Sequence, residues 1–422
     1  MPASSPGNRL RRYAAALLAI GCVHPALAWE NNHIHMIVGE RPLGMGGAYT
    51  AISDDPSGLY YNPAGIVYGY APNLSASVNS WQWTDSRYND ALGGADFERS
   101  SSELLPNFFG TTQPVGPLTV GISYAVTRAV REDQIQRFTG WEGAVFDDYT
   151  VNVDNQDTET KIGPSAALEI NRRFSVGMTL YFHHRKRKTV MNQVIESEDW
   201  DQPQWENIYY DRQETGITPI IGALLNAGDR LALGASVRTT EVLSSTTVRQ
   251  ATCHGHSEFP SEAGSLCQPE EVNHNRPVET SPRETYPWEI RFGAAFFATT
   301  NLLLAADVIY YTEEGDYEAT WNAAAGLEYY LNPRWALRGG LFTNHAHTPE
   351  LVYDGETVNQ PEHVNYYGGT VSISHFARNS SVTLGLTHSI GTGKAQIVGG
   401  WDGVQDVEAS TTSLFLGTSY SY

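Results

Sequence analysis

Apolar residues alternate with small or polar residues in many separate segments of this chain of 422 residues. In the segment 118–130, for example, Leu118, Val120, Ile122 and Tyr124 alternate with threonine, glycine and serine. A period of two places the two kinds of side chain on opposite faces of a β-strand. The same period recurs at 174–184, 288–296, 302–310, 321–329 and 382–390. The pattern therefore predicts an all-β protein.

The connections between these segments alternate between short turns and long polar stretches. The short turns are rich in Asn, Gly and Pro and lie at 115–117, 171–173, 226–228, 299–301, 332–333 and 378–380. The polar stretches, which we expect to be loops, lie at 84–103, 132–158, 191–212, 244–285, 346–362 and 392–410. This arrangement indicates about fourteen antiparallel strands closed into an outer-membrane β-barrel over residues 70–422. A propeller would repeat a blade motif, and a sandwich of this length would leave edges to protect.

Residues 1–28 have the three parts of a secretory signal peptide: arginines, a short apolar core at 13–23 and the small-residue site Ala26-Leu27-Ala28. Lipoprotein processing before Cys22 is the alternative. Either one predicts export, and together with the barrel pattern this predicts the cell outer membrane of a Gram-negative type of cell. The mean hydropathy of −0.34 fits a barrel, in which only every second strand residue meets lipid; a soluble secreted β-protein is the other interpretation.

The charge balance and the motifs exclude several functions. Acidic residues number 47 against 27 basic ones, which argues against a nucleic-acid partner. The chain lacks the nucleophile elbow, the zinc-protease helix motif and a phosphate loop. We therefore expect no enzyme, no cofactor and no metal. The histidine pairs that could chelate a metal are expected to be solvated instead; they are His33/His35, His254/His256 and His345/His347.

Residues 29–69 are unlike the rest of the chain. They contain Gly44-Met45-Gly46-Gly47 and the tripeptide Asn62-Pro63-Ala64, which make a poor strand and a poor helix. A compact plug inside the barrel suits such a segment. The segment resembles the N-terminal hatch of FadL-type outer-membrane transporters, whose signature includes an Asn-Pro-Ala tripeptide. The resemblance implies passive uptake of hydrophobic molecules, either long-chain fatty acids or hydrocarbons.

The resemblance also implies a route for the ligand. In FadL-like transporters a hydrophobic ligand leaves sideways where the third strand is kinked, which suggests Gly121 as a weak point in the strand 118–130. The alternative is that Gly121 is only a small residue facing the lumen. Asn62, Pro63 and Ala64 would lie at the inner end of the path, with a structural turn as the alternative. A PorV-like interaction or assembly barrel of a secretion system shares part of the motif. An outer-membrane phospholipase-like enzyme is a third class.

The stretch 191–212 supplies a candidate outer binding groove, because exposed apolar clusters in a loop usually mark a binding surface. The groove residues would be Val194, Ile195, Trp200, Trp205 and Tyr209. Packing within the loop itself is the alternative.

Cys253 and Cys267 lie in one polar stretch of an exported chain, so we expect a disulfide between them. A zinc site formed with His254 and His256 is the alternative.

Charged residues on the expected inner face should pair with one another and with the hatch; they are Glu289, Arg291, Asp307, Glu328 and Arg338. The last strand ends on Tyr422, which resembles the terminal signal read by the barrel-assembly machinery. The expected partners are thus that machinery, lipopolysaccharide and outer-membrane lipid, and the barrel is expected to be a monomer.

Overall fold

The computed structural model describes residues 31–69, 72–92, 95–139, 147–198, 202–254, 277–281, 283–315, 317–353, 360–396 and 404–421. The expected signal peptide, Trp200 and Cys267 lie outside these ranges, so the leader and the disulfide remain predictions. Cys253 lies in the strand β8 (Glu241–His254).

The strands form one closed antiparallel barrel, as the alternation predicts. They are β1 (Asn73–Leu92), β2 (Ala95–Val115), β3 (Leu118–Thr139), β4 (Asp148–Asn171), β5 (Phe174–Glu196), β6 (Gln204–Asn226), β7 (Leu231–Arg238), β8, β9 (Val278–Thr280), β10 (Glu289–Phe297), β11 (Leu302–Tyr311), β12 (Thr320–Asn332), β13 (Trp335–Asn344), β14 (His363–Phe376), β15 (Ser380–Ala395) and β16 (Gln405–Ser421). β7 and β8 both pair with β6 and form one interrupted wall strand, and β9 and β10 form another. The barrel therefore has fourteen wall strands, closed by pairing of β1 with β16.

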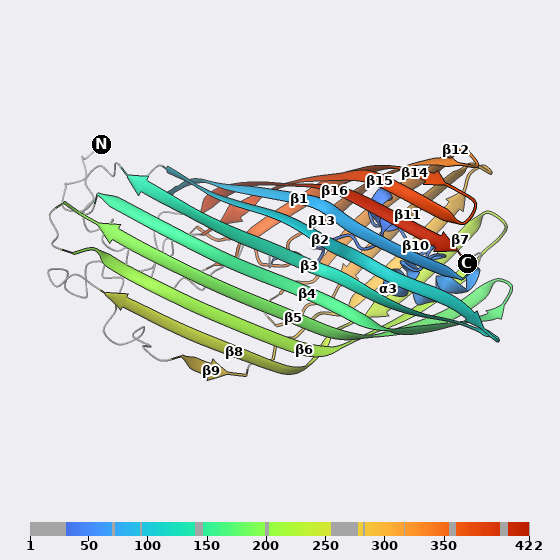
Figure 1. Cartoon of the computed structure of the whole chain (residues 1–422), viewed down its shortest axis with the longest axis horizontal. Helices are drawn as coiled ribbons and strands as arrows, with labels where there is room; N and C mark the ends of the chain where they lie inside the picture. The colour runs from blue at the N-terminus through green and yellow to red at the C-terminus, as the bar shows by residue number, and fades with distance from the viewer. Residues whose placement is uncertain are drawn as a thin grey trace.

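The wall is much taller on one side than on the other. β1 to β6 have 20 to 24 residues each, whereas β10 to β13 have 9 to 13. Figure 1 shows the long strands running along the whole molecule, while β10 and β11 lie towards the end that carries the short turns and the C-terminus. We call that end the inner end and the opposite end the outer end.

The long strands correct the expected loops. Most of the stretch 191–212 and the first part of the stretch 244–285 are strand, because β5 continues to Glu196, β6 begins at Gln204 and β8 continues to His254. Beyond the lipid-facing part, the outward face of a strand carries polar side chains although the strand continues. The regular alternation of apolar and polar residues is then weaker, and the polar stretch is mistaken for a loop.

An apolar belt surrounds the part of the barrel near the inner end. On β5 the outward residues Met178, Leu180 and Phe182 are 41 to 51% exposed, and His184 and Lys186 follow them on the same face. Several aromatic residues near the strand ends are exposed as well: Trp81, Trp83, Trp288, Trp321, Tyr329 and Trp335. Such a belt with aromatic edges is typical of a lipid-facing surface.

Residues 31–69 lie inside the barrel, near its inner end (Figure 1). They form two single-turn helices, α2 (Glu40–Gly44) and α3 (Gly58–Tyr61), and a 3₁₀ helix η1 (Pro63–Tyr68). Most of their side chains are buried, including Tyr49 and Leu59 at 0% exposure. We call residues 31–69 the hatch.

None of the described helices combines the length and the apolar character that crossing a bilayer requires.

Apolar side chains also close the outer end of the barrel. Rings from four adjacent strands follow one another, with centroids 5.9 Å apart from Tyr88 to Phe97, 6.3 Å from Phe97 to Phe138 and 5.9 Å from Phe138 to Tyr149. These rings belong to one buried cluster with residues of β5, β6, β14, β15 and β16. We call this cluster the outer seal.

Candidate functional site

The tripeptide Asn62-Pro63-Ala64 sits on two glycines of the wall. Gly177 and Gly222 face each other across β5 and β6. A β-carbon on Gly222 would lie 2.0 Å from Asn62 Oδ1, and one on Gly177 would lie 2.5 Å from the Pro63 carbonyl carbon. Only glycine leaves room for the hatch to approach the wall this closely.

The Asn62 side chain links three parts of the molecule. Its Nδ2 donates to the Thr50 carbonyl at 2.8 Å and to the Ala223 carbonyl of β6 at 3.0 Å. Its Oδ1 accepts from the Ala64 N–H at 3.2 Å and caps η1. These contacts hold the tripeptide as an anchor of the hatch near the inner end.

Inward charges of the wall hold the other side of the hatch. Glu328 accepts from Arg41 of the hatch through two bonds of 3.0 Å, and from Arg338 at 2.6 Å. Asp307 accepts from the hatch residues Tyr49 and Thr50. The expected pairing of these inner charges with one another and with the hatch is confirmed.

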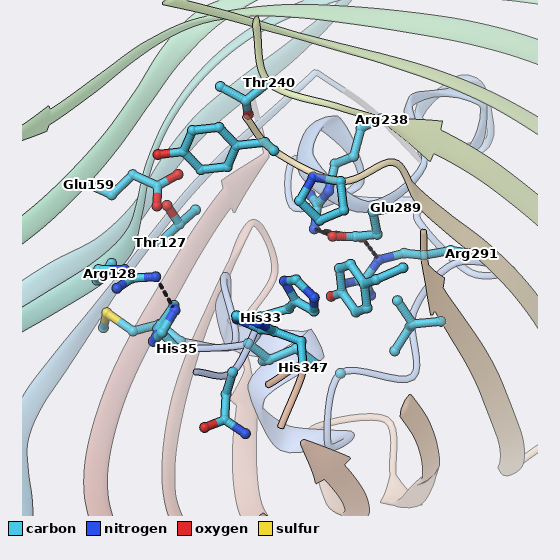
Figure 2. Close-up of a pocket in the computed structure, with 18 of the residues that line it drawn as sticks. His33, His35, Thr127, Arg128, Glu159, Arg238, Thr240, Glu289, Arg291 and His347 are labelled. Carbon is cyan, nitrogen blue, oxygen red and sulfur yellow. Dashed lines mark hydrogen bonds and ion pairs between the residues drawn. The ribbon is translucent and has the colours of Figure 1, made fainter. Parts of the chain in front are cut away.

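A cavity of about 140 Å³ lies between the hatch and the outer part of the wall. Its lining combines the hatch residues His33 and His35 with wall residues such as Arg128, Glu289 and His347. Figure 2 shows Arg128 and His35 on one side of it and Arg238, Glu289 and Arg291 on the other. The cavity is thus lined by charged and aromatic groups together rather than by apolar groups alone.

The charged groups of the lining are paired with carboxylates. Arg238 Nη2 binds Glu289 at 2.7 Å, and Arg291 binds the same carboxylate. On the opposite side, Arg185 Nη2 binds Asp157 at 2.8 Å and Arg128 Nη1 binds it at 3.2 Å. Each of these carboxylates therefore binds two guanidinium groups and holds them in place at the cavity wall.

Aromatic rings form a stack in the middle of the cavity. The His33 ring lies 3.9 Å from the Tyr311 ring and 4.2 Å from the His347 ring. Burial, reinforced by the nearby His347, lowers the pKa of His33 well below its usual value. Burial and the Arg128 guanidinium do the same to the pKa of His35. Neutral imidazoles give the cavity flat faces on which another ring can stack.

The histidines correct one expectation. His33 and His347 were expected to be solvated, but His347 is 3% exposed and both line the cavity. Their neighbours in the sequence gave no sign of this, because the two residues come together only when the hatch enters the barrel. Arg128 carried a weak signal, since it interrupts the apolar and small residues of the segment 118–130.

The wall is irregular beside the cavity, but not at Gly121. Gly121 pairs regularly with Thr112 of β2 and Ser165 of β4, and lies against Leu59 of the hatch. The ladder between β2 and β3 instead ends at Phe108 opposite Ala125.

Above that point a bulge follows in β3, between Val126 and Arg128. Beyond Phe108 and Ala125, the described residues of β2 and β3 have no backbone pairing with each other. We call this region, residues 95–107 of β2 and 126–139 of β3, the β2–β3 seam.

Residues of the hatch fill the inner side of this seam. Met36 packs against Val126 and Ala129 of β3. Asn107 of β2 accepts from the Gly39 N–H at 2.8 Å and donates to the Ile37 carbonyl at 3.1 Å. The hatch therefore substitutes for the missing wall hydrogen bonds at this height.

Higher up, side chains bridge the seam. Gln136 Nε2 donates to the Asp96 carbonyl at 2.9 Å, and Gln134 Oε1 accepts from the Ser100 N–H at 3.0 Å. The two strands are thus held side by side in the outer half without a backbone ladder.

The four described candidate groove residues are strand residues; Val194, Trp205 and Tyr209 lie on one face of the wall and Ile195 on the other. Ile195 is 1% exposed and belongs to the outer seal. Val194 and Trp205 pair across β5 and β6 on the other face, and Tyr209 lies further along β6. Trp200 is outside the described residues.

Comparisons with known proteins bear on the fold. No family model matches the sequence, and no curated protein matches it. A FadL homologue from Pseudomonas aeruginosa aligns over 92% of this chain and 99% of its own, with a TM-score of 0.67 and 14% identity. The toluene transporter TodX of P. putida aligns over 92% of this chain and 99% of its own, with a TM-score of 0.62 and 11% identity.

The toluene transporter TbuX of Ralstonia pickettii aligns over 91% of this chain and 98% of its own, with a TM-score of 0.58 and 14% identity. In fold, the chain is a FadL-type β-barrel with an N-terminal hatch.

Proposed function

We propose that the protein is an outer-membrane channel for passive uptake of small hydrophobic molecules. The observation that carries the proposal is the position of the cavity. It lies between the hatch and the outer seal, and its lining includes Thr127 and Arg128 at the bulge of the β2–β3 seam. A molecule in the cavity is therefore next to the least regular part of the lipid-facing wall.

The seam offers a path from the cavity into the bilayer. Its inner side is lined by the apolar side chains of Met36, Val126 and Ala129. A hydrophobic molecule that moves past Met36 exchanges one apolar contact for another and avoids full hydration, which would cost about 25 cal/mol for each Å² of apolar surface. The anchored hatch blocks the alternative path along the barrel axis to the inner end.

The cavity size supports a small ring rather than a long acyl chain. A cavity of about 150 Å³ is enough for benzene in a protein interior, and this cavity measures about 140 Å³. The stacked rings of His33, Tyr311 and His347 suit a flat aromatic molecule. TodX and TbuX are described as toluene transporters, and we propose a monoaromatic compound as the ligand here.

A substitution that fills the seam tests the function. Ala129→Trp places a large side chain beside Met36 and should abolish uptake of radiolabelled toluene by Gram-negative cells that have no other channel of this type. The matched control is Ala294→Trp on β10, which lies on the same face as the exposed Phe292 and Phe296 and should leave uptake unchanged. Uptake at the unmodified rate in the Ala129→Trp variant would refute the seam as the exit.

A further inference from the structure

The backbone pairing of the wall is also interrupted on a second side of the cavity. The ladder between β7 and β10 ends at Arg238 opposite Glu289, and the ladder between β8 and β9 begins at Thr247 opposite Thr280. The two ladders are in register with each other, so the two edges of the gap between them have the same number of residues. Among the described residues of this interval, no β-pair joins the two strands. The result is a slit roughly 25 Å long at about 3.3 Å per residue.

Both edges of the slit line the cavity. One edge carries Thr239 and Thr240, and the other carries residues 284–287. We call residues 283–287 the strap. Because both edges line the cavity, the slit lies between the cavity and the outside of the barrel.

Side-chain contacts hold the strap across the slit. Thr239 Oγ1 donates to the Tyr286 carbonyl at 3.2 Å, and the Tyr286 hydroxyl donates to Glu214 at 3.1 Å. Glu284 binds Arg212 at 3.1 Å. These bonds replace a backbone ladder, so the strap can move without breaking the pairing of any strand.

The slit begins at the outer edge of the apolar belt. Trp288, which follows the strap, is 51% exposed, and Leu243 on the opposite edge is 52% exposed. Tryptophan at the end of a lipid-facing strand usually marks the membrane interface. The slit therefore begins at the level of the outer membrane interface and extends towards the outer end of the barrel.

Among the described residues, buried side chains flank the cavity towards both ends of the barrel. The outer seal lies towards the outer end, and the hatch lies towards the inner end. The slit has hydroxyl and carboxylate groups at its edges, from Thr239, Thr240 and Glu284. The inner side of the seam carries the apolar side chains of Met36, Val126 and Ala129 beside the polar side chains of Thr127 and Arg128. A ligand that comes from water and leaves into lipid would meet the two openings in that order.

We infer that the slit is the inlet through which a small aromatic ligand reaches the cavity from the outer surface. The inference rests on the proposed function. The ligand passes between Thr240 and the strap, binds against the rings of His33 and His347, and leaves through the β2–β3 seam. The inlet and the exit are thus separate openings on two sides of one cavity.

A reversible lock tests the inlet. In a Cys253→Ser, Cys267→Ser background, Thr239→Cys and Tyr286→Cys would form a disulfide across the slit. The oxidised variant should lose toluene uptake down to the level of cells without the channel, and a reductant should restore it. The control pair Val237→Cys and Ile290→Cys joins residues that are already paired and should leave uptake unchanged. Unchanged uptake in the oxidised lock would overturn the inlet.

A second measurement needs no ligand. In the same background, Thr240→Cys should react with a membrane-impermeant maleimide from outside the cell, and Tyr286→Ala should speed the reaction. Ser236→Cys is the control. Ser236 and Thr240 are buried to the same extent, but Ser236 binds the Tyr61 carbonyl of the hatch and is not part of the cavity lining, so it should not react. A Thr240→Cys variant that stays unlabelled refutes the inlet.

The two proposals can fail separately. If the lock has no effect while Ala129→Trp still blocks uptake, the inlet is wrong and the channel function stands. If the unmodified protein imports no toluene while Thr240→Cys is labelled, the channel function is wrong and the opening stands.

Discussion

Asp307 accepts two hydrogen bonds from Thr50, one from its backbone N–H at 2.9 Å and one from its hydroxyl at 2.6 Å. The same carboxylate oxygen accepts the Tyr49 N–H at 3.0 Å. Asp307 of β11 thus accepts hydrogen bonds from backbone N–H groups of a hatch turn, which has no paired strand among the described residues to accept them. This relationship explains how a segment rich in glycine stays ordered inside the barrel.

Asp307→Ala should loosen the hatch while the wall stays intact. Hydrogen bonds to a charged group contribute about 1.5–3 kcal/mol each, so amide hydrogen exchange at residues 48–51 should become much faster. Asp229→Ala, at an exposed turn of the inner end, should change nothing. Unchanged protection of Tyr49 and Thr50 in the Asp307 variant would show that other contacts hold the hatch.

Gly222→Ala should disturb the anchor of the tripeptide. The added methyl group would lie 2.0 Å from Asn62 Oδ1, and overpacking of this kind costs about 1–3 kcal/mol. We expect a lower melting temperature of the purified barrel. Gly228→Ala is the matched control because nothing lies within 4 Å of its added carbon. Equal melting temperatures for the two variants would contradict the tight fit.

The outer seal should depend on pH through Glu362. Burial raises the pKa of Glu362 to about 8 from an ordinary 4.5. Between about pH 4.5 and about pH 8, Glu362 is protonated when the outer seal is packed and ionised when the seal is open. The stability of the packed seal therefore falls as the pH rises through this range. The Tyr88 hydroxyl donates to one carboxyl oxygen at 3.3 Å, and the other oxygen is buried without a partner.

Planar-bilayer conductance checks this dependence. Conductance should rise between about pH 5 and about pH 9 as Glu362 ionises. Glu362→Gln should stay at the low value throughout, whereas Glu350→Gln, an exposed residue at the same end of the barrel, should keep the rise. A flat profile in the unmodified protein would show that Glu362 does not control the seal.

Deleting residues 30–65 should leave an assembled barrel that passes small polar solutes. The ladders that join neighbouring strands, including the closing pair β1 and β16, do not involve the hatch, while Arg41, Thr50 and Asn62, which hold the hatch, would be lost. Liposome swelling with small sugars should therefore increase, and selective toluene uptake should weaken. A deletion variant that stays impermeable would mean that the hatch is not the barrier.

Much of the fold was predictable from local pattern. The period of two on segments such as 118–130 and 174–184 reports directly which face meets lipid, and Asn, Gly and Pro mark the short turns. The number of wall strands follows from these two signals. The length of the strands did not follow: β5 runs past Lys188 to Glu196, where no lipid imposes an apolar face.

The sequence by itself determined a barrel with a hatch and pointed to Asn62-Pro63-Ala64 as a special turn. Only the tertiary structure decided where the cavity and its openings lie. His33 meets His347, and Met36 meets Ala129, because the hatch folds back into the barrel at a particular height. That height depends on the stagger and length of all the wall strands together, which no local run of residues encodes.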